Sequence, residues 1–218
     1  MIGRFADLAR EVLRAEPHVG TVRLVAVDGP AGSGKTTFAA ALADALVATG
    51  ATVGRVSVDD LRDGWGDIVG WWSAFEEEVL TPLAYGRPGR SRRYDWRAAR
   101  FTDVGMAVPV VNVLVLDGVG SAHAAAAEYL TYTVWVCTDD PALRLARLVA
   151  RDGDALTPYL VRWIADEAAQ FATDRTAERA DLYIDGSASG GADVAGSLTA
   201  TSGQYATYVG DVRKGLMG

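Results

Sequence analysis

The most specific motif of the chain is VAVDGPAGSGKTTFA, residues 25–39, and it determines the fold class. It begins inside TVRLVAVD, residues 21–28, a nearly continuous run of β-branched and apolar side chains. Such a run is typical of a strand buried on both faces of a parallel sheet. Good helix formers then run from Lys35 to Thr49, and Gly50 predicts the helix end. The order of strand, glycine-rich loop and helix predicts the first unit of an α/β fold.

The glycine-rich loop has the spacing of a phosphate-binding P-loop, because Gly29 is followed by four residues and then by Gly34, Lys35 and Thr36. In such loops backbone N–H groups surround the β-phosphate, the lysine reaches the β- and γ-phosphates, and the threonine ligates Mg²⁺. The alternative, a chance glycine turn before a helix, does not explain the lysine in register. We expect these residues to bind the phosphates of ATP: Gly29, Pro30, Ala31, Gly32, Ser33, Gly34, Lys35, Thr36 and Thr37.

Elsewhere in the chain, apolar runs predict four more strands, at residues 51–59, 109–118, 132–138 and 180–185. Helical segments accompany them, at the N-terminus before Pro17 and over residues 35–49, 68–83, 140–151 and 158–173. This alternation predicts a three-layer α/β fold with a central parallel five-stranded sheet.

A change of composition marks the end of the predicted domain. Small, flexible residues follow Asp185, so we expect one domain over residues 1–186 and a flexible C-terminal extension over residues 187–218. Within the extension, the alternation in residues 204–212 favours an added edge strand or contact with a second chain, so a homo-oligomer is left open.

Composition limits the partners and the cellular location. The 218-residue chain has a net charge of −7, which argues against general binding to nucleic acid or to an anionic membrane surface. No apolar run approaches the roughly 20 residues that span a bilayer. The single cysteine, Cys137, cannot form an intrachain disulfide, so we expect a cytoplasmic protein. Neither histidine falls into a metal-ligand spacing, and we assign them no catalytic role.

Three aspartates follow predicted strands, at the sheet edge where open α/β folds bind ligands. Asp59 and Asp60 end one strand, and Asp117 ends the apolar run VVNVLVLD. Phosphoryl transfer needs a carboxylate that accepts or orients the hydroxyl proton and an acid that helps hold Mg²⁺. Each aspartate is also a common residue at a strand-to-turn junction, which is the structural alternative.

Several ordered motifs surround the loop: VSVDDL at 56–61, RRYDW at 92–96, VLVLDGVG at 113–120, RLARLVARDG at 144–153 and RADLYIDG at 179–186. Over residues 20–186 the chain resembles the uridine kinase family and its bacterial relatives. The resemblance implies a P-loop NTPase fold of the nucleoside and nucleotide kinase type, with a mobile lid. It also implies transfer of the ATP γ-phosphate to a substrate hydroxyl.

The resemblance implies roles for individual residues. Asp59 is expected to be the catalytic base, with Asp60 in reserve, and Thr36 and Asp117 are expected to hold Mg²⁺. The family usually has glutamate at this position, so the side chain of Asp117 is one methylene shorter and reaches less far toward the ion. Arg144, Arg147 and Arg151 share one helix face, and the resemblance implies that Arg147 and Arg151 close over the transferring phosphate beside Lys35. A solvated helix face is the alternative.

The acceptor side departs from the family. Tyr94 and Trp96 could bracket a planar or apolar substrate while Asp95 accepts hydrogen bonds from hydroxyl groups; a solvated loop or a subunit contact is the alternative. The family's histidine beyond this motif has no counterpart. Tryptophans occur after Asp60 instead of the usual acceptor pattern, and such clusters are most often core or interface.

Three functions are compatible with these residues. The sequence favours a kinase of a small-molecule hydroxyl, with a nucleoside as the expected acceptor. A second reading is a kinase of another metabolite, such as a vitamin precursor or secondary metabolite, on the same core. A third is a nucleotide-binding switch, which would not need an acceptor-side base such as Asp59.

Overall fold

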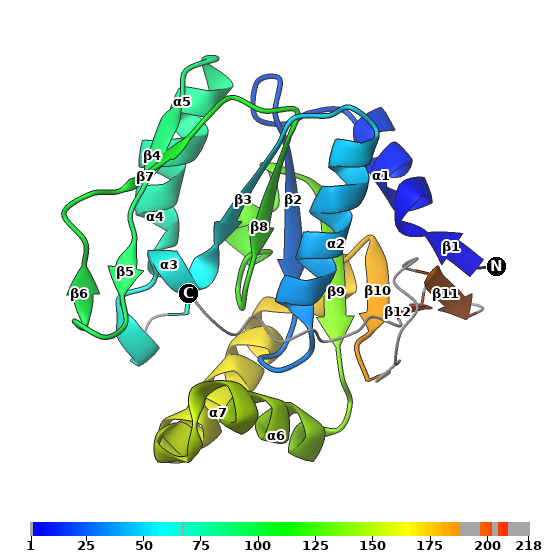
Figure 1. Ribbon diagram of the computed structural model, residues 1–218. Helices are drawn as coiled ribbons and strands as arrows, with labels where there is room; N and C mark the ends of the chain where they lie inside the picture. The colour runs from blue at the N-terminus through cyan, green and yellow to red at the C-terminus, as the bar shows by residue number, and fades with distance from the viewer. Residues whose placement is uncertain (1, 67, 188–196, 202–204, 209–218) are drawn as a thin grey trace.

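A parallel sheet runs through the middle of the molecule (Figure 1). This computed structural model describes residues 2–66, 68–187, 197–201 and 205–208. The central strands are, in spatial order, β3 (Val53–Ser57), β8 (Val113–Asp117), β2 (Arg23–Asp28), β9 (Leu130–Cys137) and β10 (Leu182–Asp185). Each is parallel to its neighbours in this set. The predicted three-layer α/β fold with a central parallel five-stranded sheet is confirmed.

Strand β2 lies at the point where the strand order reverses. The chain passes from β2 to β3 on one side, returns to β8 between them, and then crosses to β9 on the other side of β2. In open α/β sheets the carboxyl ends of strands at such a reversal form the usual ligand-binding crevice. The P-loop begins at the carboxyl end of β2, so the fold places it there.

Alternate residues of β2 are buried on opposite faces of the sheet. Val25 and Val27 pack in one core with α1 (Phe5–Arg14) and α2 (Lys35–Ala48). Leu24 and Ala26 belong to the core on the other face. That core includes side chains from three short helical segments: α4 (Trp72–Phe75), the π-helical turn η2 (Glu76–Leu80) and α5 (Thr81–Ala84). Both faces are covered, which explains why the strand sequences are continuously apolar.

The helix predicted over residues 68–83 is wrong at its start. The helical segments begin at Trp72, because residues 68–71 form a turn in which the Trp71 indole Nε1–H donates to the Ile68 carbonyl at 2.8 Å. The Trp72 N–H donates to the Val69 carbonyl at 3.1 Å. Trp71 and Trp72 are buried in the core, so tertiary packing of the indole rings determines where the helix starts.

Two antiparallel strand pairs stand beside the sheet, on the left in Figure 1. β4 (Gly89–Ser91) pairs with β7 (Met106–Val108), and β5 (Tyr94–Asp95) pairs with β6 (Arg100–Phe101). The arginine-rich segment of the sequence is therefore part of a β-hairpin arm. Before β5, the short helix α3 (Val58–Leu61) follows β3 directly.

A helical hairpin lies below the carboxyl ends of the strands in Figure 1. It consists of α6 (Pro141–Asp152) and α7 (Thr157–Asp174), joined by the 3-10 turn η4 (Asp154–Leu156). A third core holds Leu148, Leu160 and Trp163 of this hairpin against Ala31 of the P-loop. Among the described residues, no helix is both long enough and apolar enough to cross a bilayer.

The C-terminal segment adds strands to the sheet beyond β10. β12 (Tyr205–Tyr208) is parallel to β10, β11 (Ser197–Thr201) is antiparallel to β12, and β1 (Ile2–Arg4) pairs antiparallel with β11. β12 lies within the segment where an edge strand was expected, although β11 and β1 continue the sheet past it. The rest of the predicted flexible extension lies outside the described residues, and the boundary after residue 186 stays a prediction.

Candidate active site

The P-loop turns sharply between β2 and α2. Gly29 has φ +136°, and a Cβ there would lie 2.0 Å from the Val136 carbonyl oxygen of β9, so no larger residue fits. Gly34, at the start of α2, has φ +98°, and a Cβ there would meet nothing within 4 Å. The loop is therefore packed on the sheet at its beginning and open at the helix N-terminus. Backbone N–H groups at an open helix N-terminus form an anion-binding site.

Lys35 begins α2 and is only 8% exposed. Its Nζ donates to the Pro30 carbonyl at 2.8 Å, which holds the side chain back over the loop. Burial lowers the pKa of Lys35, while Glu167, Asp28, Asp59 and Asp117, in decreasing order of effect, favour its charged form. A cation in such surroundings can bind the phosphates of a nucleotide, which bring additional negative charge.

Asp117 at the end of β8 is almost fully buried. Its Oδ1 accepts from Arg55 Nη2 at 3.4 Å, while Oδ2 is buried and has no hydrogen-bond partner among the described residues. Burial raises the pKa of Asp117, and the charge of Arg55 and the Thr36 hydroxyl lower it. A buried, unpartnered carboxylate oxygen beside a hydroxyl offers the oxygen ligands that Mg²⁺ prefers. The residues present therefore fit this ion.

Asp59 and Asp60 lie on α3, immediately after β3. The Ser57 hydroxyl caps this short helix by accepting from the Asp59 N–H at 3.3 Å. Asp59 is half-exposed, and its Oδ1 accepts from Arg62 Nη2. Burial raises the pKa of Asp60, and the Arg93 guanidinium lowers it. Ser57, at the end of β3, is paired with Asp117 of β8, so the structure brings the predicted acceptor-side aspartates next to the predicted metal ligand.

The three arginines of α6 have different partners. Arg144 Nη1 donates to Glu167 at 2.9 Å and to the Ala31 carbonyl at 3.3 Å. Arg147 Nη1 donates to the Gly186 carbonyl at 2.9 Å and to the Gly32 carbonyl at 3.3 Å.

Arg151 forms two 2.7 Å hydrogen bonds with Asp152, the main cause of its raised pKa, to which the charge of Asp59 also contributes. Arg144 and Arg147 thus donate to carbonyl groups of the P-loop, whereas Arg151 is paired with its neighbour Asp152. The predicted closing of Arg147 and Arg151 on a phosphate stays a prediction.

Two buried acids of the site were missed by the sequence reasoning. Asp28 is fully buried, and its carboxylate accepts from Gly29 N at 2.6 Å, Gly120 N at 3.0 Å and Ala122 N at 2.8 Å. Burial raises its pKa to about 6. Glu167 on α7 is 1% exposed and accepts from Ala31 N at 2.8 Å. Asp28 could have been noticed as the acid that ends an apolar strand immediately before the P-loop, whereas Glu167 looks like any helix-surface acid.

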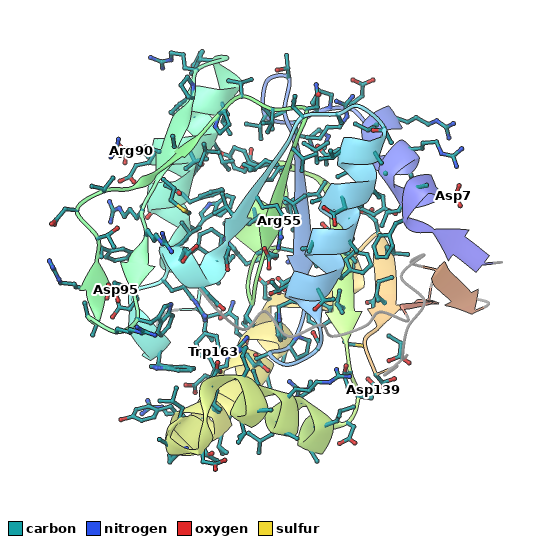
Figure 2. The ribbon with its side chains drawn as sticks, in the orientation of Figure 1. Asp7, Arg55, Arg90, Asp95, Asp139 and Trp163 are labelled. Carbon is teal, nitrogen blue, oxygen red and sulfur yellow. The ribbon has the colours of Figure 1, made fainter. Side chains whose placement is uncertain are left out.

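The predicted substrate residues lie on the β5–β6 side of the site (Figure 2 shows Asp95 there). Tyr94 is buried edge-on against Trp96, with ring centroids 5.2 Å apart and a 74° angle between the rings. Asp95 accepts from the N–H groups of Arg97 and Ala98. Trp96 Nε1–H donates to the Asp59 carbonyl at 3.1 Å. Trp96 is thus hydrogen-bonded to a predicted catalytic residue, and the substrate roles of all three stay predictions.

The three tryptophans after Asp60 separate into two groups. Trp71 and Trp72 pack in the core with Phe75 and His123. Trp65 instead lies at the site, where its ring is 5.4 Å from Trp96 and 6.1 Å from Trp163 of α7. Figure 2 shows Trp163 between α7 and the carboxyl ends of the strands. An aromatic cluster therefore connects the β5–β6 hairpin with the helical hairpin across the acceptor side.

Comparison with solved structures identifies the fold. A protein assigned as a possible uridine kinase from Bacillus stearothermophilus superposes with a TM-score of 0.60 at 18% identity, over 83% of this chain and 96% of that chain. A protein assigned as a fructose transport system kinase from Silicibacter sp. TM1040 gives 0.54 at 22% identity, over 83% and 98%. No protein-family model and no curated sequence matches the chain. The likenesses confirm the predicted three-layer α/β fold.

Proposed function

We propose that this protein is an ATP-dependent phosphotransferase that transfers the γ-phosphate to a hydroxyl group of a small molecule. One observation carries the proposal: a P-loop with Lys35 and Thr36, a buried carboxylate at Asp117 and a half-exposed carboxylate at Asp59 converge at one edge of the sheet. A phosphate site, a cation site and an acceptor-side base are the parts that phosphoryl transfer requires.

Residues 29–37 supply the nucleotide site. The backbone N–H groups of the loop and of the first turn of α2 bind phosphate oxygens, and Lys35 exchanges its hydrogen bond with the Pro30 carbonyl for the phosphates. Thr36 and Asp117 would hold Mg²⁺. When bound, this ion neutralises charge on the β- and γ-phosphate oxygens.

Asp59 acts on the acceptor. Its carboxylate accepts the hydroxyl proton as the acceptor oxygen bonds to the γ-phosphorus, and the bond from that phosphorus to the β,γ-bridging oxygen breaks to release ADP. Asp60 is the reserve candidate, although burial holds its pKa above the usual value. Arg147 and Arg151 stabilise the transferring group once they leave their present partners.

The acceptor is a small molecule bound between α3, the β5–β6 hairpin and α7. One structural relative is described as a possible uridine kinase and the other as a fructose transport system kinase, and one fold can serve different acceptors. The sequence resemblance favours a nucleoside, contacted by Tyr94, Asp95 and Trp96. We propose a cytoplasmic location, supported by a lone cysteine in a chain whose described helices cannot span a bilayer.

Acceptor-dependent transfer tests the proposal directly. The protein is incubated with Mg²⁺ and γ-labelled ATP, with and without candidate alcohols, and the label is followed into phosphorylated product. We expect ADP release to depend on the acceptor and to require Lys35. ATP binding accompanied by no transfer to any alcohol would favour the nucleotide-binding switch and overturn the kinase.

A further inference from the structure

Arg62 is a buried cation beside the candidate base. It follows α3, its side chain is 5% exposed, and its Nη2 donates to Asp59 Oδ1. Its guanidinium carbon lies 4.2 Å from the Trp163 ring centroid and 6.0 Å from that of Trp96. Aromatic side chains from α7 and from the β5–β6 hairpin therefore contact this one group.

The guanidinium of Arg62 is incompletely satisfied. Nε and Nη1 are both buried, and neither has a hydrogen-bond partner among the described residues. Its ion-pair partner, Asp59, is half-exposed. A buried charged group with free donors is costly, because each lost hydrogen bond to water must be replaced. The arrangement indicates that a ligand supplies the missing acceptors.

The guanidinium of Arg62 indicates what kind of ligand this is. Arg93 lies close enough to Asp60 to lower its pKa, and Arg151 interacts electrostatically with Asp59. The carboxylates of Asp59, Asp60 and Asp152 stand against these arginines, so the surroundings of Arg62 are mixed in charge and its selectivity comes from the guanidinium itself. The planar N–H groups of arginine match carboxylate and phosphate oxygens.

We propose that the acceptor molecule carries an oxyanion, a carboxylate or a phosphate, in addition to its reacting hydroxyl, and that Arg62 binds this oxyanion through Nε and Nη1. The proposal rests on the proposed function and specifies its substrate class. The Trp163 ring lies over the guanidinium, which leaves its in-plane N–H groups at Nε and Nη1 to bind the oxyanion. Asp59, adjacent in space, accepts the proton of the hydroxyl group.

A neutral nucleoside explains these observations less well. Its carbonyl and hydroxyl groups could accept hydrogen bonds from Arg62, but they would leave the buried positive charge with Asp59 as its only described ion-pair partner. Asp59 must also act on the acceptor hydroxyl. An oxyanion on the acceptor provides the second negative charge, and a charge-assisted hydrogen bond is roughly twice as strong as a neutral one.

Matched pairs of alcohols test the acceptor class. ADP release and the melting temperature in the presence of ATP are measured with glycerol against glycerate, with ribose against ribose 5-phosphate, and with uridine. The proposal expects the acidic member of at least one pair to be preferred by tenfold or more in kcat/KM. The first pair reports a carboxylate and the second a phosphate.

Two failures are distinguishable in this panel. If uridine or the neutral members are phosphorylated and no acidic member is, the proposed oxyanion is wrong and the proposed kinase activity is retained. If the protein binds ATP but no acidic compound is phosphorylated or raises the melting temperature, the proposed oxyanion is also wrong. Absence of ATP binding overturns the proposed function itself.

A variant of Arg62 tests whether this residue causes the preference for an acidic acceptor. Arg62→Met keeps most of the stem volume and removes the charge, so KM for the preferred acidic acceptor is expected to rise at least tenfold while KM for ATP stays within threefold. Arg162→Met, at a strongly exposed arginine of α7, is the control and should change neither constant. An unchanged acceptor KM in a folded Arg62→Met protein overturns the assignment. If this variant does not fold, the acceptor panel still decides the substrate class.

Discussion

Single residues of the P-loop have effects that can be separated from the fold. Lys35 begins α2 and is buried against the P-loop, and its Nζ donates to the Pro30 carbonyl. Loss of this side chain removes charge from the phosphate site without opening a hydrophobic core.

Lys35→Ala is therefore expected to remain folded and to lose transfer. Removing a key electrostatic contact to the transition state costs about 3 kcal/mol, or on the order of 10²-fold in rate. The measurement is acceptor-dependent ADP release, with the melting temperature as the test of folding. Transfer within tenfold of the parent would contradict the P-loop assignment.

Asp59 and Asp60 provide a matched pair for locating the base. Asp59→Asn keeps the volume and cannot accept a proton, so it should bind ATP normally and lose transfer by about 10²-fold or more. Asp60→Asn should be milder. Single-turnover transfer and ATP binding are measured on both. An inactive Asp60→Asn with an active Asp59→Asn would reverse the assignment.

Asp28 predicts a pH-dependent contribution to stability. Its pKa in the folded protein is raised to about 6, from 3.8, because burial penalises the charged form more than three backbone N–H groups favour it. An acid with a raised folded pKa contributes stability that is fully present below its unfolded pKa and is lost as the pH rises through the folded value. The change is about 3 kcal/mol at 1.36 kcal/mol per pKa unit.

Comparison with Asp28→Asn isolates this contribution, because asparagine does not titrate. We expect the variant to be less stable at pH 5, since its amide cannot accept all three N–H groups, and the deficit to shrink between pH 5 and pH 8. The free energy of unfolding is measured by urea denaturation at both values. A deficit that grows with pH would contradict the raised pKa.

At the scale of elements, the helical hairpin and the P-loop are joined through Glu167. This residue accepts from the Ala31 N–H and from Arg144, and Arg144 also donates to the Ala31 carbonyl. We therefore expect a movement of α6 or α7 to be transmitted to the P-loop. The aromatic cluster of Trp65, Trp96 and Trp163 makes a second connection, from α7 to the β5–β6 hairpin.

Glu167→Gln tests the connection between the helical hairpin and the P-loop. The amide oxygen can still accept a hydrogen bond, but the buried charge of Arg144 loses its partner, so we expect a loss of about 3 kcal/mol in unfolding free energy. KM for ATP should rise because Ala31 is less well positioned. Asp166→Asn on the same helix is the control: its ion pair with Arg162 is exposed and 3.6 Å long, and its loss should cost under about 0.5 kcal/mol. Equal effects of the two variants would contradict the coupling.

At the scale of the whole molecule, the C-terminal segment joins the sheet away from the phosphate site. β12 pairs with β10, and β11 pairs with β1 near the N-terminus. The groups that contact the P-loop from this side, the Gly186 backbone and Arg147, precede the segment. Stability and catalysis are thus expected to respond differently to its removal.

Truncation after Gly186 is predicted to retain ATP binding and a sizeable fraction of turnover. Removal of β11 and β12 leaves the outer edge of β10 unpaired, so the melting temperature should fall, and any change of oligomeric size should appear in light scattering. The full-length chain is the control for both measurements. A truncated protein with an unchanged melting temperature and no transfer would mean that the segment contributes to the active site.

The sequence was informative where structure depends on neighbouring residues. The P-loop and the strand and helix beside it are contiguous, so backbone preferences and apolar periodicity suffice to predict them. The five strands of the parallel sheet were predicted for the same reason. Asp59, Asp60 and Asp117 could be placed at one edge because they follow parallel strands, whose carboxyl ends meet there.

Tertiary structure alone decided which groups are buried together. Asp28 meets Gly120 and Ala122, 92 and 94 residues away, and Glu167 meets Ala31 across 136 residues. Arg62 is stacked on Trp163 for the same reason, because the fold brings the end of α3 against α7. No local pattern marks such partners, because a charged side chain on a helix is usually solvated. Its burial depends on the surfaces that the packed fold brings against it.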